Sequence, residues 1–255
     1  VIVGGIKSIG NVAEKVVPLM CGIYLLAALG VILANIELLP EAVGIIFAEA
    51  FTPAAGMGGL IGVFIQGVKR AAFGSEAGVG SAAIAHSAAK TDEPVREGIV
   101  ALLEPFIDTI VVCFMTGMVI VISGVYADPE TAALNGVELT SAAFGQTFEF
   151  FPVVLSVAVF LFAFSTMISW SYYGERCWTF LFGHTQTLSY RIIFLVFVVI
   201  GCSTSLGNVT DFSDIMILSM AFPNIIGVVL LSGKLKDALD VYWRKYKNDE
   251  FKIYT

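Results

Sequence analysis

The stretch from Arg70 to His86, RAAFGSEAGVGSAAIAH, lies within an apolar run, residues 57–90, that is long enough to cross a bilayer. It nevertheless contains one arginine, one glutamate, one histidine, two serines and three glycines. Each glycine weakens a helix by about 1 kcal/mol relative to alanine. Close packing of helices through small residues would not need Ser75 and Glu76 between the glycines. We therefore expect a helix that breaks near Gly74 in mid-membrane, where freed backbone groups bind a solute.

The composition around this stretch is that of an all-α integral membrane protein. Hydrophobic residues make up 57% of the chain and charged residues 14%, whereas a soluble domain has about 25% charged residues. The mean hydropathy is +0.87. The four cysteines lie in or beside apolar runs without the spacing of a metal site, so we interpret them as small core residues. No signal peptide is recognisable after Val1.

Six apolar stretches predict six membrane spans in a bundle over residues 1–232, followed by a cytoplasmic tail, 233–255. The spans are 17–36, 57–90, 97–123, 150–172, 188–206 and 211–232. Twelve of the 14 lysines and arginines fall on one side of this arrangement, and the opposite loops, 37–56 and 124–149, contain only acidic charges. The positive-inside rule then places both ends in the cytoplasm. A short segment from Pro40 is expected to form an amphipathic interfacial helix.

Several charges fall at membrane depth. Lys69 and Arg70 lie about 18 Å into the second span if it is helical, and Glu104 and Asp108 share one face of the third span. A charge near the bilayer centre costs about 2.5–3.5 kcal/mol, so these groups must face one another or a watery cavity. They form either structural ion pairs, for example Arg70 with Asp108, or a permeation pathway. Together with the helix break, the group favours a pathway.

A second polar cluster lies in the fourth span, FLFAFSTMISWSYYGE. The hydroxyls of Ser165 and Thr166 and the carbonyl of Phe162 could supply three oxygens to an alkali cation. Alternatively, the hydroxyls bond back to their own helix.

Three motifs in this order strongly resemble the sodium:alanine (alanine or glycine:cation) symporter family. They are FGSEAGVGSAAIAHSAAKTDEPVREGIVALLEPFIDTIVV, FAFSTMISWSYYGE and DFSDIMILSMAFPNIIGVVLLSG. The resemblance implies a LeuT-type (APC superfamily) fold over residues 3–232, with core helices five to ten and a broken sixth helix. The sequence departs from the family pattern in two places, since Gly74-Ser75 replaces Ser-Asn and Ala83 replaces proline.

The resemblance implies a secondary active transporter in the cell inner (plasma) membrane, not an enzyme. It would couple sodium ions to symport of a small neutral amino acid, alanine or glycine, by alternating access. The chain would be the C-terminal half of such a carrier, and its partner would be a missing N-terminal half that supplies most contacts to the substrate carboxylate. The half-carrier is then expected not to transport alone.

The resemblance also implies roles for individual residues. Phe73 and Trp170 are expected as pocket walls that limit the substrate side chain, with Gly74, Ser75 and Gly78 as further substrate contacts. The implied sodium ligands are Phe162, Ser165 and Thr166. Glu76 and Asp108 are expected to have structural or coupling roles, Glu76 by capping amides of the unwound turn.

The sequence also leaves other functions to be considered. A proton-coupled amino acid carrier of the same fold is the main alternative, and a channel is less favoured. Ser81 and His86 are spaced i,i+5 and lie about 140° apart on a helix, so they cannot form a hydrolytic pair. For His86 we favour a hydrogen-bonded buried side chain over a proton-coupling role. No feature indicates a nucleic-acid partner.

Overall fold

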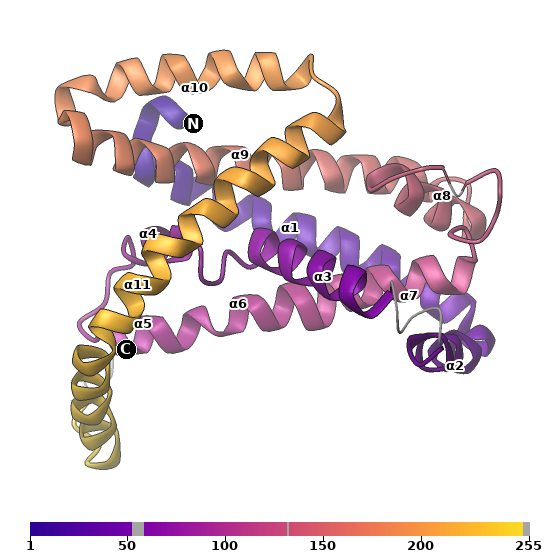
Figure 1. Cartoon of the computed structure of the whole chain (residues 1–255), viewed down its shortest axis with the longest axis horizontal. Coiled ribbons are helices and arrows are strands. Elements are labelled where there is room, and N and C mark those ends of the chain that lie inside the picture. Colours follow the sequence, from indigo (N-terminus) through magenta and orange to yellow (C-terminus); the bar gives the residue numbers. More distant parts are fainter. Residues whose placement is uncertain (53–58, 132, 252–255) are drawn as a thin grey trace. The chain divides into compact units, whose positions relative to one another are not determined.

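A computed structural model describes residues 1–52, 59–131 and 133–251, and the regular structure in this part of the chain is entirely helical (Figure 1). The main helices are α1 (Gly5–Ala34), α2 (Leu39–Ala50), α3 (Leu60–Gly74), α4 (Ser81–His86), α5 (Pro94–Ala101), α6 (Leu103–Pro105), α7 (Phe114–Ser123), α8 (Val137–Thr147), α9 (Phe151–Phe182), α10 (Thr187–Cys202) and α11 (Leu206–Lys247). A π-helical stretch, Phe106–Cys113, joins α6 to α7. Short 3₁₀ turns precede α1, α2 and α10.

Within the described residues, five helices are long and apolar enough to cross a membrane. They are Gly5–Ala34, Pro94–Ser123, Phe151–Phe182, His184–Cys202 and Leu206–Lys247. The remaining predicted span, 57–90, contains the two helices α3 and α4 with a break between them. These lengths confirm a multi-pass, all-helical membrane protein.

The chain divides into two compact units. The first contains Val1–Gln66 and Thr109–Cys202, and the second contains Gly67–Asp108 and Ser203–Thr255.

The core of the first unit is formed by α1, α7, α8 and α9. Its fully buried side chains include Val31 of α1, Val119 of α7, Phe144 of α8 and Ala158 of α9. Ala28 of α1 is also fully buried, and small residues such as these let membrane helices approach closely. Because dispersion contacts replace the missing hydrophobic driving force in lipid, this close packing is what holds the unit together.

Polar bonds fix the same helices to one another. Thr116 on α7 donates its hydroxyl proton to the Val112 carbonyl at 2.8 Å. Tyr24 on α1 also hydrogen-bonds Thr116 Oγ1, and it must be the donor because the single threonine proton is already used. Arg191 of α10 donates to both carboxylate oxygens of Glu175 on α9, at 2.7 and 3.2 Å. These bonds satisfy groups that lipid could not hydrate.

Apolar side chains cover the outer surface of the spans. On α10 the exposed large residues are Leu188, Ile192, Ile193, Leu195, Val196, Phe197, Val199 and Ile200. In water such a surface would be unfavourable, whereas in a bilayer it faces lipid tails.

Two elements were not expected from the sequence. The loop 124–149 contains the helix α8, whose Ala143 and Phe144 are fully buried. The last helix does not end near residue 232 but continues as α11 to Lys247. The predicted helix from Pro40 is confirmed as α2.

Candidate functional site

The helix break lies where the glycines predicted it. α3 ends at Gly74, residues 75–80 are not helical, and α4 begins at Ser81. Gly78 and Gly80 have φ values of 80° and 96°, which a residue with a Cβ rarely adopts. Glu76 also has a positive φ, 54°, although it is not glycine. Such backbone strain persists only where surrounding structure enforces it, and it often marks a functional site.

Asn224 of α11 holds the middle of the break. Its side-chain amide donates a hydrogen bond to the Gly78 carbonyl at 2.9 Å. A Cβ at Gly80 would lie 3.0 Å from Asn224 Oδ1, which is tighter than an ordinary contact, so the asparagine would have to move to admit any other residue. The sequence contains a signal for this contact, because Asn224 is an amide within the apolar stretch 220–231, directly after Pro223.

Two buried serines flank the break. The Ser75 hydroxyl donates to the Ala71 carbonyl at 2.8 Å, which satisfies it within α3. The Ser81 hydroxyl is buried and has no hydrogen-bond partner among the residues that the structure describes. A buried hydroxyl without a partner is costly, and a bound polar molecule would remove that cost.

The charges before the break form one cluster. Arg70 pairs with both carboxylate oxygens of Asp214 on α11, the Oδ2 contact being 2.5 Å, and Lys69 Nζ lies 4.0 Å from the same Oδ2. The Arg70 guanidinium also lies over the Phe73 ring, 5.4 Å from its centroid. The suggested pair of Arg70 with Asp108 is therefore wrong, because the buried Asp214 carboxylate takes the guanidinium instead.

Asp108 faces the break instead. A Cβ placed on Gly74 would lie 2.7 Å from Asp108 Oδ2, so the carboxylate sits directly against the end of α3. Asp108 lies in the π-helical stretch, a distortion that is frequent at functional sites. A carboxylate at this position adds negative charge beside the freed backbone, which suits a bound cation or ammonium group.

The side chains after the break form a second cluster. His86, at the end of α4, has Nδ1 2.7 Å from Glu97 Oε1 on α5 and Nε2 3.6 Å from Glu104 Oε2 on α6. Glu104 and Asp108 thus lie on one face, as their i,i+4 spacing predicted, and the structure turns that face toward the broken helix.

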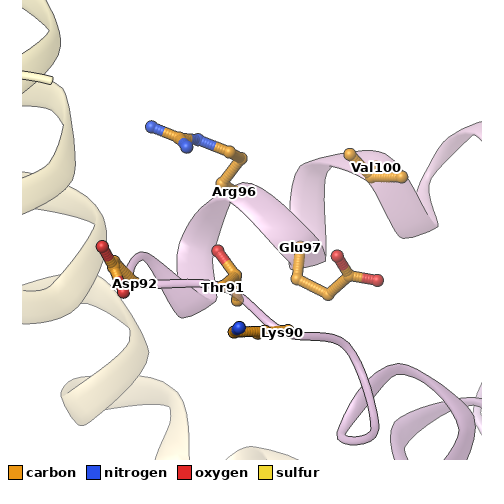
Figure 2. A pocket seen from close by; sticks show the side chains of 6 residues that line it. All are labelled: Lys90, Thr91, Asp92, Arg96, Glu97 and Val100. Atoms are coloured by element: carbon orange, nitrogen blue, oxygen red, sulfur yellow. The ribbon is translucent and has the colours of Figure 1, made fainter. Parts of the chain in front are cut away.

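Two pockets lie beside this second cluster. One, of about 380 Å³, is lined by His86, Ser87, Ala89, Thr91, Pro94, Glu97 and Gly98. The other, of about 520 Å³, is shown in Figure 2. Lys90, Thr91 and Asp92 reach it from the loop after α4, and Arg96, Glu97 and Val100 from α5 (Figure 2).

The end of α11 attaches to the start of α5. Lys245 donates to Glu93 Oε1 at 2.8 Å, and the Arg96 guanidinium lies over the Phe251 ring at 4.9 Å. Tyr242 is buried and packs on Phe251 with ring centroids 4.8 Å apart. The long helix is therefore held to the segment that follows the break.

The residues implied as sodium ligands lie on α9 in the first unit. The Ser165 hydroxyl is buried and donates to the Phe162 carbonyl at 2.9 Å, so two of the implied oxygens are neighbours. Thr166 is exposed. Trp170, one turn later, is partly buried and contacts Tyr173 edge-on. A cation here would need the Ser165 proton to rotate away, and oxygens from other parts of the protein.

Among the residues implied for substrate, Phe73, Gly74, Ser75 and Gly78 lie together at the break. Glu76 and Asp108 lie there as well. Trp170 belongs with the α9 residues in the other unit.

These features define a class of protein before any comparison is made. A multi-pass helical membrane protein with a glycine-rich break, backed by charged and hydroxyl side chains, has the construction of a secondary transporter. The chain belongs to the sodium:alanine symporter family, which matches residues 1–254. The expectation of a symporter-family protein rather than an enzyme is thereby confirmed.

Three curated relatives illustrate the family. The chain is 42% identical over 250 residues to a sodium/alanine symporter, AgcS, of Methanococcus maripaludis, covering 98% of this chain and 55% of the relative. It is 34% identical over 250 residues to a probable sodium/glutamine symporter, GlnT, of Bacillus subtilis, covering 97% and 52%. It is 31% identical over 263 residues to a sodium/proton-dependent alanine carrier protein of Bacillus sp. (strain PS3), covering 96% and 59%.

The chain therefore spans about half the length of the curated relatives it matches. The expectation that it is the C-terminal half of a carrier stays a prediction.

Proposed function

We propose that this chain forms part of a sodium-coupled symporter for a small neutral amino acid, alanine or glycine. The observation that carries the proposal is the break at residues 75–80, in a chain of the sodium:alanine symporter family. The proposed fold is of the LeuT type, in which a broken helix binds substrate near the bilayer midplane. The proposed location is the cell inner membrane, with both ends of this chain in the cytoplasm. The lysines and arginines on one side of the predicted spans support this orientation.

The break supplies the chemistry that an amino acid needs. In the proposed site, carbonyl groups freed around Phe73 and Gly74 accept the substrate ammonium, and Asp108 adds negative charge beside them. Ser75 and Gly78 are proposed as further contacts, and the unpartnered Ser81 hydroxyl is a candidate for another. Phe73 limits the side chain, with the Arg70 guanidinium fixing its ring.

Sodium is the proposed co-transported ion, with Phe162, Ser165 and Thr166 as ligands. The Ser165 hydroxyl now bonds back to the Phe162 carbonyl of its own helix at 2.9 Å. In the proposed ion-bound state the hydroxyl proton turns away, so that both oxygens are available to the cation. Glu76 is proposed to cap amides of the unwound turn.

Uptake by the protein expressed from its complete reading frame tests the proposal. In proteoliposomes, an inward sodium gradient should drive saturable accumulation of labelled alanine, and replacing sodium by choline at constant pH should abolish it. Rapid flux without a gradient requirement would instead indicate a channel, and unchanged uptake in choline would contradict sodium coupling.

Trp170→Ala should widen substrate selectivity. If Trp170 limits the pocket, removing its indole opens room for several carbon atoms, each worth about 0.8 kcal/mol of burial. Competition of alanine uptake by valine or leucine should then improve about tenfold. Trp243→Ala, on the polar end of α11, is the matched control. Unchanged competition would count against Trp170 as a pocket wall.

Thr166→Ala should raise the sodium concentration needed for half-maximal uptake about tenfold, which corresponds to about 1.4 kcal/mol. Substrate preference should not change, because the lost hydroxyl is proposed to contact the ion only. Ser156→Ala is the matched control, since Ser156 lies on the same helix and its hydroxyl bonds the Pro152 carbonyl at 2.7 Å. An equal shift in both variants would mean that the helix, not an ion site, was disturbed.

A further inference from the structure

His86 is held between two carboxylates, whereas a histidine with a purely structural role needs only one hydrogen-bond partner. Glu97 Oε1 lies 2.7 Å from Nδ1, and Glu104 Oε2 lies 3.6 Å from Nε2. The acids come from α5 and α6, and the histidine is the last residue of α4. All three belong to one compact unit.

The number of ring protons decides how well this cluster is satisfied. A neutral imidazole has one N–H donor and one acceptor nitrogen, whereas the protonated ring has a donor on each nitrogen. Since carboxylates only accept, the protonated ring can donate to Glu97 from Nδ1 and turn its second N–H toward Glu104 at the ion-pair distance of 3.6 Å, whereas the neutral ring leaves one carboxylate facing a lone pair. The geometry thus provides a place for one exchangeable proton.

Water can reach the cluster. The pocket of about 380 Å³ is lined by His86 and Glu97, together with the hydroxyl residues Ser87 and Thr91. The His86 side chain is 27% exposed and that of Glu97 is 25% exposed. A proton can therefore enter and leave while the histidine keeps its partners.

We propose that His86, with Glu97 and Glu104, is a proton-binding site whose occupancy is coupled to the position of α4. This proposal deepens the proposed function and rests on it: the site would bind a co-transported proton in addition to sodium. α4 is only six residues long and follows the non-helical residues 75–80, so it can shift without disturbing α3. A shift away from α5 and α6 separates the histidine from both acids, so the ring loses both carboxylate partners.

The difference between the packed and the displaced position of α4 couples proton binding to the movement of the helix. If the packed position of α4 holds the proton and the displaced position releases it, a proton gradient biases the movement, and the movement carries the proton. The charged groups facing the ring are Glu97 from α5 and Glu104 from α6. α11 also packs against α5, where its Lys245 pairs with Glu93.

Proteoliposomes containing the protein from its complete reading frame test this. With sodium equal on both sides and the membrane potential clamped to zero, an inward proton gradient should drive alanine accumulation at least threefold above equilibrium. Addition of alanine should acidify the lumen, as reported by trapped pyranine. His86→Gln should abolish both effects and retain uptake driven by a sodium gradient.

His86→Lys guards against a simple folding defect, because a permanent cation keeps the pairing with both glutamates but releases no proton near neutral pH. It should behave like His86→Gln. His184→Gln, which alters the chain's other histidine in an exposed turn, should behave like the unmodified protein.

The outcomes separate the two proposals. If sodium drives uptake in the unmodified protein and the proton gradient does not, the proton site is wrong and the proposed function stands. If His86→Lys keeps proton-driven uptake, the proton binds elsewhere and the site is wrong. If neither gradient drives uptake in the unmodified protein, the proposed function itself fails.

Discussion

Asp214→Asn should reduce the amount of correctly inserted protein, and uptake with it, by about tenfold. The buried Asp214 carboxylate is the partner of Arg70 on both of its oxygens, and Lys69 lies 4.0 Å from it. Asparagine has nearly the same shape but no charge. The variant therefore leaves the two cations of α3, Lys69 and Arg70, without the negative charge of the Asp214 carboxylate.

The expected size of this effect follows from the cost of an unpaired charge in the bilayer. One such charge costs about 2.5–3.5 kcal/mol near the midplane. Because the Arg70 side chain is 47% exposed and can relax, we take about half of this value. That corresponds to about a tenfold change in the folded population.

Two further variants make this measurement specific. Asp211→Asn changes the same kind of residue three positions earlier, at an exposed site, and should have little effect. The exchange Arg70→Asp with Asp214→Arg restores opposite charges across the pair and should recover part of the insertion measured by size-exclusion chromatography. If Asp214→Asn inserts and transports like the unmodified protein, the pair does not stabilise α3 against α11.

The sequence was sufficient to predict the break because its cause is local. Three glycines and two hydroxyl residues in one short run weaken a helix wherever it is placed. In the resulting break at residues 75–80, Gly78 and Gly80 adopt positive φ values that other residues rarely take. The shared face of Glu104 and Asp108 was predictable for the same reason, because residues four positions apart lie on one side of a helix.

The partners across helices were not predictable in the same way. From the sequence, Arg70 could pair with any of several acidic residues. Only the packing of α11 brings Asp214 to it. The bond from Asn224 to the Gly78 carbonyl joins residues 146 positions apart, so no local pattern reveals it. α8 was missed because its apolar face is short and is interrupted by polar residues, although tertiary packing buries Phe144 completely.

Gly80→Ala should lower the apparent affinity for alanine by about tenfold or more. Gly80 has a φ of 96°, and a residue with a Cβ in the left-handed region costs about 1–2 kcal/mol. The added Cβ would also lie 3.0 Å from Asn224 Oδ1 and 3.2 Å from its Cγ, tighter than ordinary contacts. The asparagine must then move, which weakens its 2.9 Å bond to the Gly78 carbonyl.

Gly67→Ala is the matched control, because a Cβ there meets no atom within 4 Å and α3 tolerates alanine better than glycine. Substrate binding can be measured for each variant by alanine-dependent thermal stabilisation of the purified protein. Gly67→Ala should leave that stabilisation unchanged, and Gly80→Ala should shift it to higher alanine concentrations.

A double variant tells whether the effect passes through Asn224. Asn224→Ala removes the side-chain atoms that a Cβ at Gly80 would meet, and it also removes the hydrogen bond to the Gly78 carbonyl. If Gly80→Ala lowers the affinity by displacing Asn224, it should cause little further loss in the Asn224→Ala background. Gly80→Ala with Asn224→Ala should then lose less than the product of the two single losses, a non-additivity expected only for residues in contact. Strictly additive losses would mean that Gly80 acts through its own backbone strain, and that the Asn224 bond does not set the geometry of the break.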